Sequence, residues 1–199
     1  VLRGIALLGI LIMNIQSFSM ISAAYMNPAA WGDLTGLNKW VWIISHVMAS
    51  DKFMAIFSML FGAGVLLFTS KALEKGKRPA PLHYRRMFWL LVFGLMHAYL
   101  IWYGDILVAY ALCGMLAFVF RKTKVKTLLI VGAAFFVVPV LLGLFGYATM
   151  DFWPQESIDE NLKSWQPAIA EINKEIEIRR GSWLQQMDFR VKQSIFMET

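Results

Sequence analysis

Residues 87–120 read MFWLLVFGLMHAYLIWYGDILVAYALCGMLAFVF and contain two apolar stretches, 87–103 and 106–120, with only Gly104 and Asp105 between them. A helix needs about 20 mostly apolar residues, within a usual range of about 17–25, to cross the hydrocarbon core of a bilayer. The first stretch meets this length and the second nearly does. A connection this short permits only a tight antiparallel hairpin. The segment therefore predicts two adjacent membrane helices.

Three further apolar stretches flank the hairpin, at residues 4–25, 53–69 and 127–150. The chain is 58% hydrophobic and 16% charged, whereas a soluble domain is about 45–50% apolar and about 25% charged. We therefore predict an all-α fold in which residues 1–150 form a polytopic transmembrane bundle of about five spanning helices. The composition excludes a disordered, collagen-like or disulfide-rich secreted protein. The single cysteine, Cys113, has no neighbouring His/Cys cluster at metal-ligand spacing, so no metal site is predicted.

Basic residues are concentrated in two short loops, and this distribution predicts the orientation of the bundle. Lysines and arginines of short loops collect on the cytoplasmic side of a membrane. The formal net charge of +6 therefore reports membrane topology, and no nucleic-acid partner is indicated. We expect Arg3 and the N-terminus to be cytoplasmic, with residues 26–52 and 151–199 outside. The basic side chains of the two loops are Lys71, Lys75, Lys77, Arg78, Arg85, Arg86, Arg121, Lys122, Lys124 and Lys126.

Two amphipathic segments lie outside the predicted spans. Residues 37–50 contain Trp40 and Trp42 beside polar side chains, which predicts a helix at the outer membrane interface. Residues 151–199 carry an apolar stripe at helical spacing, so we predict an extracytoplasmic amphipathic helical region. Pro167 should interrupt its helix and Gly181 should end it. Because the chain has no initial Met and closes within a helical pattern, we expect a fragment in which this region leads toward a further membrane segment.

Polar side chains inside apolar spans are costly, and each is by default a candidate site. Asn14 lies ten residues after Gly4, and His97 lies eleven residues after Arg86, which correspond to about 15 Å and about 16 Å along a helix. We therefore expect both near mid-membrane, in one shared cavity. The alternative for Asn14 is an interhelical hydrogen bond. The alternative for His97 is a neutral ring bonded to a backbone carbonyl or Tyr99, and its functional role would be that of a general base.

Other polar or small residues in these segments also admit two interpretations. Asp105 precedes the fourth stretch, where it would cap a helix, orient a histidine or bind a hydroxyl group. Tyr110 would pack within the bundle or contact substrate. Arg3 would attract a phosphate at the cytoplasmic entrance or extend to the interface. The run Gly-Ala-Gly at residues 62–64 predicts close helix packing and does not fit a phosphate-binding loop.

Four short runs stand out in the first 150 residues: LRGIALLGILIMNI at 2–15, FGLMHA at 93–98, WYGDIL at 102–107 and YAL at 110–112. Together they resemble the YeiB-like family of bacterial membrane proteins, which is built around a domain of unknown function. The resemblance covers most of residues 1–150 and implies a location in the bacterial inner membrane. That family belongs to a wider group resembling membrane-embedded acyltransferases, which move an acyl group from a cytoplasmic donor to an extracytoplasmic acceptor.

The resemblance also shows where this chain departs from those acyltransferases. Enzymes that modify surface polysaccharides often carry a histidine eleven residues after the Arg of the LRG run, where this chain has Asn14. The lysosomal heparan glucosaminide acetyltransferases are more similar, with Asn at that spacing and a catalytic histidine a further eleven residues on. That position is Tyr25 here. The resemblance thus leaves His97 as the strongest base, with Asn14 positioning the thioester or the acceptor.

We therefore expect a transmembrane acyltransferase whose other partners are the lipid bilayer and a carbohydrate or lipid acceptor. Its donor would be a substrate such as acyl-CoA, with phosphates near Arg85 and Arg86, and no tightly bound cofactor is expected. Two other classes stay open: a transporter or lipid-handling protein without covalent chemistry, and a non-catalytic scaffold whose outer tail recruits partners. The predicted catalytic residues are His97, Asn14 and Asp105, and the predicted substrate-binding residues are Arg3, Arg85, Arg86 and Tyr110.

Overall fold

The computed structural model describes residues 1–198, and side chains through residue 195. The described residues contain helices and no strand, which confirms the all-α class. The α-helices are α1 (Leu2–Ser19), α2 (Ser22–Met26), α3 (Gly36–Ala49), α4 (Lys52–Glu74), α5 (Pro79–Met96), α6 (Leu107–Val119), α7 (Val125–Ala148), α8 (Gln155–Trp165), α9 (Ile169–Arg180) and α10 (Met187–Glu198). A π-helix, η1 (His97–Ile101), continues α5, and the 3₁₀ turns η2 (Phe120–Lys122) and η3 (Met150–Phe152) flank α7.

Three helical stretches of the described chain are long and apolar enough to cross a membrane, fewer than the five predicted. They are α1, the 39-residue stretch Gly36–Glu74 that combines α3 and α4, and α7. The third predicted span fails because the first half of α5 contains the polar run His83 to Arg86. The fourth fails because α6 has only 13 residues, about 20 Å of helix against a core of about 30 Å. The first predicted span also ends early, because α1 stops at Ser19.

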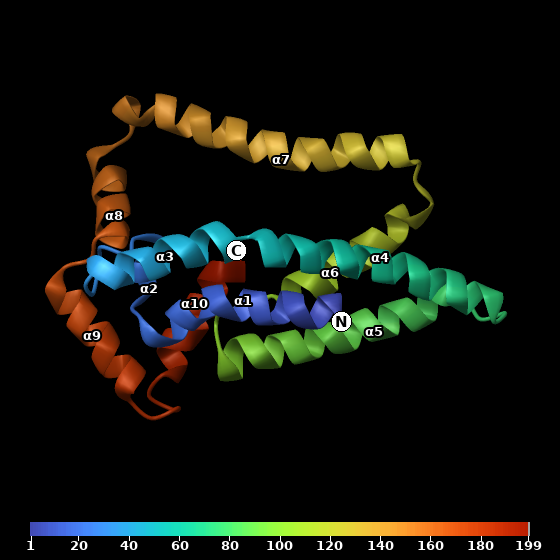
Figure 1. The fold of residues 1–199 in the computed structure, drawn as a ribbon, viewed down its shortest axis with the longest axis horizontal. Coiled ribbons are helices and arrows are strands. Elements are labelled where there is room, and N and C mark those ends of the chain that lie inside the picture. The colour runs from blue at the N-terminus through green and yellow to red at the C-terminus, as the bar shows by residue number, and fades with distance from the viewer. Residues whose placement is uncertain (199) are drawn as a thin grey trace.

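The helix predicted near residues 37–50 forms as α3 and lies end to end with α4 (Figure 1). The two helices are separated at Ser50 and Asp51, and Asp51 has a left-handed backbone with φ of 57°. At 1.5 Å per residue, a 39-residue stretch measures about 58 Å, roughly twice the hydrocarbon thickness. Part of the stretch must therefore lie outside the apolar layer, and the interfacial location of α3 stays a prediction.

The predicted hairpin forms: α5 packs along α6, and the two helices run antiparallel. His83, near the start of α5, stacks on Phe118 near the end of α6. Gly94, near the end of α5, meets the backbone of Val108 at the start of α6. An ideal Cβ on Gly94 would lie 2.7 Å from the Val108 nitrogen, so only glycine permits this approach. The fourth helix, α4, packs against both members of the hairpin and joins it to α1.

The small residues at 62–64 do not form the helix-packing face predicted for them. The side chain of Arg3 lies over Gly64, where its guanidinium donates a hydrogen bond of 2.8 Å to the carbonyl of Leu60. A Cβ added to Gly62 would meet nothing within 4 Å. The missing side chain of Gly64 thus makes room for an arginine, and close packing of α1 on α4 occurs instead where Gly9 meets the ring of Phe53.

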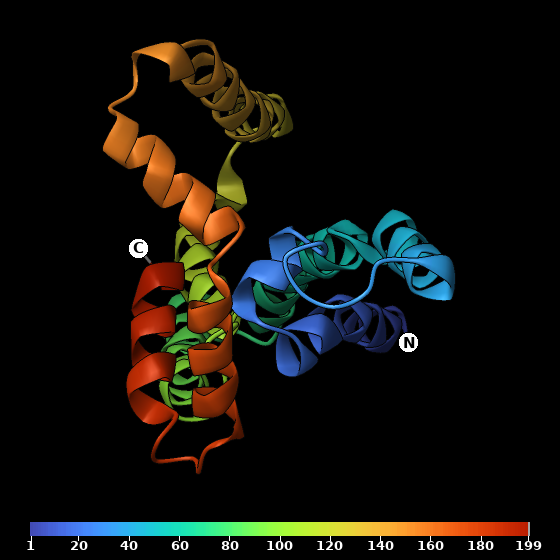
Figure 2. The same cartoon turned by 90° about the vertical axis from the view of Figure 1, so that its left-hand side faces the viewer.

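Residues 151–198 are mostly helical; α8 packs against α2, and α10 packs against η1 (Figure 2). The helix is interrupted between Trp165 and Ile169, around Pro167, as predicted. The next helix, α9, ends directly before Gly181, also as predicted. Ile172 of α9 is buried in a small apolar cluster with Ile21 and Ala24. In contrast, α7 runs apart from the other helices and has no buried residue (Figure 1).

The close approach of α5 and α6 gives a stability prediction. Gly94→Ala places a methyl group against the Val108 backbone, so the helices must separate, and we expect the unfolding free energy to fall by about 1–3 kcal/mol. Thermal unfolding of the detergent-solubilised protein measures the change. Gly143→Ala in α7 is the matched control, because its Cβ would meet nothing within 4 Å. Equal melting temperatures for Gly94→Ala and the wild type would contradict the packing assignment.

Candidate active site at the α5–α6 turn

His97 and Asp105 form a hydrogen-bonded pair where the chain turns from α5 into α6. The Nδ1 atom of His97 lies 2.8 Å from Oδ1 of Asp105. The Asp105 side chain is buried, with 2% of its area exposed, whereas 32% of the His97 side chain is exposed. An ionised carboxylate is only an acceptor, so Nδ1–H donates and the second ring nitrogen, Nε2, keeps a lone pair. The pair therefore has the arrangement of a base oriented by a buried acid.

Asp105 also caps α6, so two of the three roles considered for it, capping a helix and contacting a histidine, occur together. Its second oxygen, Oδ2, accepts a hydrogen bond of 2.8 Å from the backbone N–H of Val108. The first N–H groups of a helix have no partner within the helix, and a side-chain oxygen at this position satisfies one of them. The carboxylate is held at one oxygen by the helix and at the other by the imidazole.

The backbone beneath His97 is a π-turn whose carbonyls receive donors from α10 and the segment before it. Ser194 donates its hydroxyl to the carbonyl of Ala98 at 2.8 Å. The indole Nε1 of Trp183 donates to the carbonyl of Leu100 at 2.6 Å, and Arg190 donates to the same oxygen. Ser194 and Arg190 are both buried. Residues about 90 positions away therefore stabilise the turn that carries His97, and the sequence patterns gave no sign of this contact.

An aromatic contact connects the His97–Asp105 pair, called the dyad below, to α1. The ring of Trp102 meets that of His97 edge to face, with centroids 6.2 Å apart. Trp102 also contacts the ring of Phe18 of α1, with 4.6 Å between the centroids. Offset and edge contacts of this kind stabilise aromatic pairs beyond their burial. The last turns of α1 thus help to fix the imidazole.

Arg179 of α9 is the centre of a polar network that sequence analysis did not identify. Its guanidinium donates to Glu175 at 2.8 Å, to the Ser22 hydroxyl at 3.0 Å and to the Tyr103 hydroxyl at 2.9 Å. It also donates to the backbone carbonyl of Ser17 at 2.9 Å. Glu175 in turn accepts from the backbone and hydroxyl groups of Ser22, both at 2.8 Å. The network joins α9 to the α1–α2 junction and to the residue that follows Trp102.

His97 is the only described histidine paired with a carboxylate. His83 is buried, stacks on Phe118 and lies 2.9 Å from the carbonyl of Gly114 through Nε2. His46 donates from Nδ1 to the carbonyl of Trp42 at 2.9 Å. Each thus has one hydrogen bond to the backbone, and the buried Nδ1 of His83 has no partner in the described structure. His83 was not singled out from the sequence, because its position among Tyr84, Arg85 and Arg86 suggested a loop.

Of the other predicted site residues, Tyr110 and the three arginines make their contacts elsewhere in the fold. No hydrogen bond of the described residues joins Asn14 to His97, and His97 lies at the end of its helix rather than midway along a continuous span. Tyr110 is buried between Phe57 and Phe61, with its hydroxyl 2.6 Å from that of Ser58. Three arginines lie elsewhere. Arg3 of α1 bonds to a carbonyl of α4, the guanidinium of Arg86 lies 4.3 Å from the centroid of the Phe68 ring, and Arg85 is exposed on α5.

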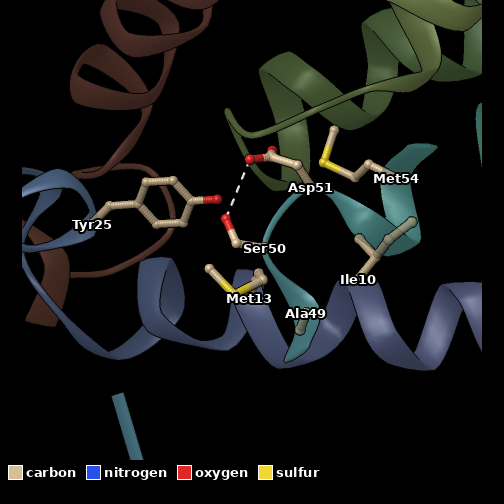
Figure 3. Close-up of a pocket in the computed structure, with 7 residues that line it drawn as sticks. All are labelled: Ile10, Met13, Tyr25, Ala49, Ser50, Asp51 and Met54. Carbon is tan, nitrogen blue, oxygen red and sulfur yellow. Dashed lines mark hydrogen bonds between the residues drawn. The ribbon is translucent and has the colours of Figure 1, made fainter. Parts of the chain in front are cut away.

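A small cavity of about 20 Å³ lies between α1, α2 and the α3–α4 break (Figure 3). Tyr25, Ser50 and Asp51 provide its polar wall, and the hydroxyl of Ser50 lies 3.3 Å from Oδ2 of Asp51. The phenol of Tyr25 points toward these two groups (Figure 3). The cavity has room for about one water molecule. Among the described residues, no three His, Cys, Asp or Glu side chains gather closely enough to hold a metal ion.

Burial raises the pKa of the Tyr25 phenol above its usual value of 10.0, and the charge of Asp51 raises it further. Tyr25 belongs to α2, outside the three membrane-type stretches. The unfolded chain ionises first as the pH rises, so this tyrosine contributes a loss of stability above about pH 10 and none at neutral pH. The phenol therefore stays a hydrogen-bond donor throughout the physiological range.

The raised pKa can be measured by spectrophotometric titration, as the difference between the wild type and Tyr25→Phe. We expect this difference to titrate above pH 10, and we expect Asp51→Asn to lower the pKa without restoring the usual value, since burial is the larger cause. Tyr147→Phe, which changes an exposed tyrosine of α7, is the control. A Tyr25 difference that titrates at pH 10 or below would contradict the geometry.

Comparison with known proteins adds the following. No protein-family model matches the chain, and no solved structure matches it. The uncharacterized protein YxaH of Bacillus subtilis (strain 168) is 37% identical over 169 residues, which cover 78% of this chain and 40% of that protein. The uncharacterized protein YeiB of Escherichia coli (strain K12) is 37% identical over 172 residues, 85% of this chain and 41% of that protein. An uncharacterized 39.9 kDa protein encoded in the amylase 3' region of Bacillus acidopullulyticus is 33% identical over 85% of this chain. The chain spans less than half the length of these relatives.

Proposed function

We propose that this chain, whose homologues YeiB and YxaH support a YeiB-like family, is part of a membrane acyltransferase with His97 as its general base. The protein would move an acyl group from a cytoplasmic donor such as acyl-CoA to an extracytoplasmic carbohydrate or lipid. The apolar helices fit a membrane protein. The observation that carries the proposal is the 2.8 Å bond between partly exposed His97 and the buried side chain of Asp105.

The pair has the geometry that proton abstraction needs. Asp105 accepts the Nδ1 proton, which fixes the tautomer and leaves Nε2 basic. Once Nε2 takes a proton, the buried carboxylate stabilises the imidazolium ion across the 2.8 Å contact. Because Val108 holds the second carboxylate oxygen, Asp105 cannot rotate away without losing the α6 cap. Asp105 is thus proposed as a positioning residue.

The proposed step conserves atoms and charge. His97 Nε2 removes the proton from an acceptor hydroxyl or amine, and the freed electron pair attacks the thioester carbon. The carbon–sulfur bond then breaks, and the leaving thiolate takes the proton from the imidazolium to give the free thiol. The products are the acylated acceptor and coenzyme A, with His97 returned to its neutral form.

The positions of Arg86 and His97 along one helical run suit a donor and an acceptor that arrive from opposite faces of the membrane. Arg86 lies eleven residues before His97 on the same helical run, about 16 Å along its axis. Phosphates of the donor at Arg85 and Arg86 would therefore be separated from the imidazole by the length of the helix. Asn14 is proposed to position the thioester or the acceptor. Arg3 and Tyr110 remain predicted substrate contacts, although both bond to α4.

Transfer of a radiolabelled acyl group by the full-length protein in lipid nanodiscs tests the proposal. With acyl-CoA and a panel of glycosides and glycolipids, we expect His97→Gln to lower kcat by about 100- to 10,000-fold. Asp105→Asn should lower kcat while leaving the KM for acyl-CoA unchanged, and Asp105→Glu should restore part of the rate. Tyr147→Phe, at an exposed position of α7, is the control.

Full transfer by His97→Gln would remove His97 from the mechanism. A protein that transfers no acyl group to any acceptor, but moves a solute across proteoliposomes without covalent change, would favour the transporter class instead. One observation supports that class: the α3–α4 stretch is broken at Asp51 beside a small polar cavity, and interrupted helices line the binding sites of many transporters.

A further inference from the structure

A second and larger cavity, of about 300 Å³, lies between the last turns of α1, the short helix α2, the connection at residues 27–35 and α3. Gln16 of α1 and Met20, which directly follows this helix, line it. Phe18, which contacts Trp102 beside the dyad, lies two residues after Gln16 and therefore about 160° away from it around the helix. The cavity therefore occupies the opposite face of α1 from His97 and is a site separate from the proposed active site.

The wall of this cavity contains a hydrogen-bond donor and an acceptor without partners. The Nε1–H of Trp42 and the Oε1 of Gln16 are both buried, and neither has a hydrogen-bond partner in the described structure. Buried polar groups in native proteins are almost always bonded, because leaving one unpaired costs free energy. A hydroxyl group can both donate and accept, so the hydroxyl groups of a ligand suit an unpaired acceptor as well as an unpaired donor.

The remaining lining residues also suit a ligand with several hydroxyl groups. Trp31 and Trp42 contribute aromatic rings to the wall. Asp33 accepts from the backbone N–H of Thr35 at 2.9 Å through Oδ1 and leaves its second oxygen for another donor. Asn38 donates to the backbone carbonyl of Asp33 at 3.1 Å, which keeps its amide oxygen as an acceptor. The loop is thus shaped by its own hydrogen bonds before any ligand enters.

The charge and size of the cavity restrict the ligand further. Asp33 is the only charged residue that lines it, so an anionic group would be repelled. An alkyl chain would fill the space but leave Trp42 and Gln16 unpaired. A volume of about 300 Å³ is at the lower end of the range for small-molecule sites, which combine apolar walls with a few polar groups. The ring of His46 packs against that of Trp42, with the centroids 4.1 Å apart and the planes tilted by 31°, and holds the indole in place.

We propose that this cavity binds a neutral sugar ring, whose hydroxyl groups bond to Trp42 and Gln16 and whose C–H face packs on the tryptophan rings. The sugar is either a free glycoside or the headgroup of a glycolipid, and both present the same chemistry. The site is independent of the acyl-transfer proposal, because it requires only binding.

Binding to the full-length protein in nanodiscs tests the site with three probes. Methyl β-D-glucopyranoside is measured by saturation-transfer NMR and calorimetry, and monoglucosyl diacylglycerol and plain diacylglycerol are measured by native mass spectrometry. We expect the glucoside, the glucolipid or both to bind, and diacylglycerol to bind more weakly than the glucolipid. Glucolipid binding without glucoside binding assigns the ligand to a membrane source. Glucoside binding assigns it to a soluble one.

Two conservative variants connect binding to the unpaired atoms. Trp42→Phe keeps an aromatic ring without the N–H, and Gln16→Met keeps the length without the acceptor, so each should weaken binding by roughly 3- to 10-fold. Trp40→Phe, at an exposed position of α3 outside the cavity, should bind as the wild type does. Gln16→Met keeps the test decisive if loss of the indole disturbs folding. Failure of both sugar probes, equal binding of diacylglycerol and glucolipid, or unchanged binding by both variants would overturn the proposal.

Discussion

The turn between α5 and α6 depends on polar side chains that bond to its backbone. A π-turn followed by a new helix leaves carbonyls and N–H groups without partners, and such groups are costly in apolar surroundings. Asp105 supplies the acceptor for α6, and Ser194, Trp183 and Arg190 supply donors for η1. The dyad exists because these bonds hold the backbone on both sides of it.

Residues 151–198 are therefore part of the folded unit around the turn. Arg179 and Glu175 bond to the α1–α2 junction and to Tyr103, while α10 bonds to η1. The helices α1 and α9, which are more than 150 residues apart in sequence, thus share one polar network. The predicted boundary at residue 150 marks a change in composition, but residues after this boundary form hydrogen bonds with residues before it.

Local patterns predicted the features that depend on neighbouring residues. The Gly-Asp connection predicted the hairpin and the cap, and Pro167 and Gly181 predicted the ends of α8 and α9. The number of spans was wrong, because the apolar run from residue 87 was counted without the polar residues of the same helix that precede it. The partners of η1 and the Arg179 network were not predictable, since no spacing rule connects Leu100 to Arg190 or Ser17 to Arg179. The 300 Å³ cavity likewise depends on how α1 and α3 pack.

Asp105 divides its two oxygens between a helix and a ring, and this has a mechanical consequence. The imidazole is carried by the end of α5, but its orientation is set by a carboxylate fixed to the first turn of α6. A shift of one helix against the other by the length of a single hydrogen bond would separate the two side chains, although each would remain on its own backbone. The orientation of the His97 ring is thereby coupled to the register of the hairpin, which the contact between Gly94 and Val108 defines.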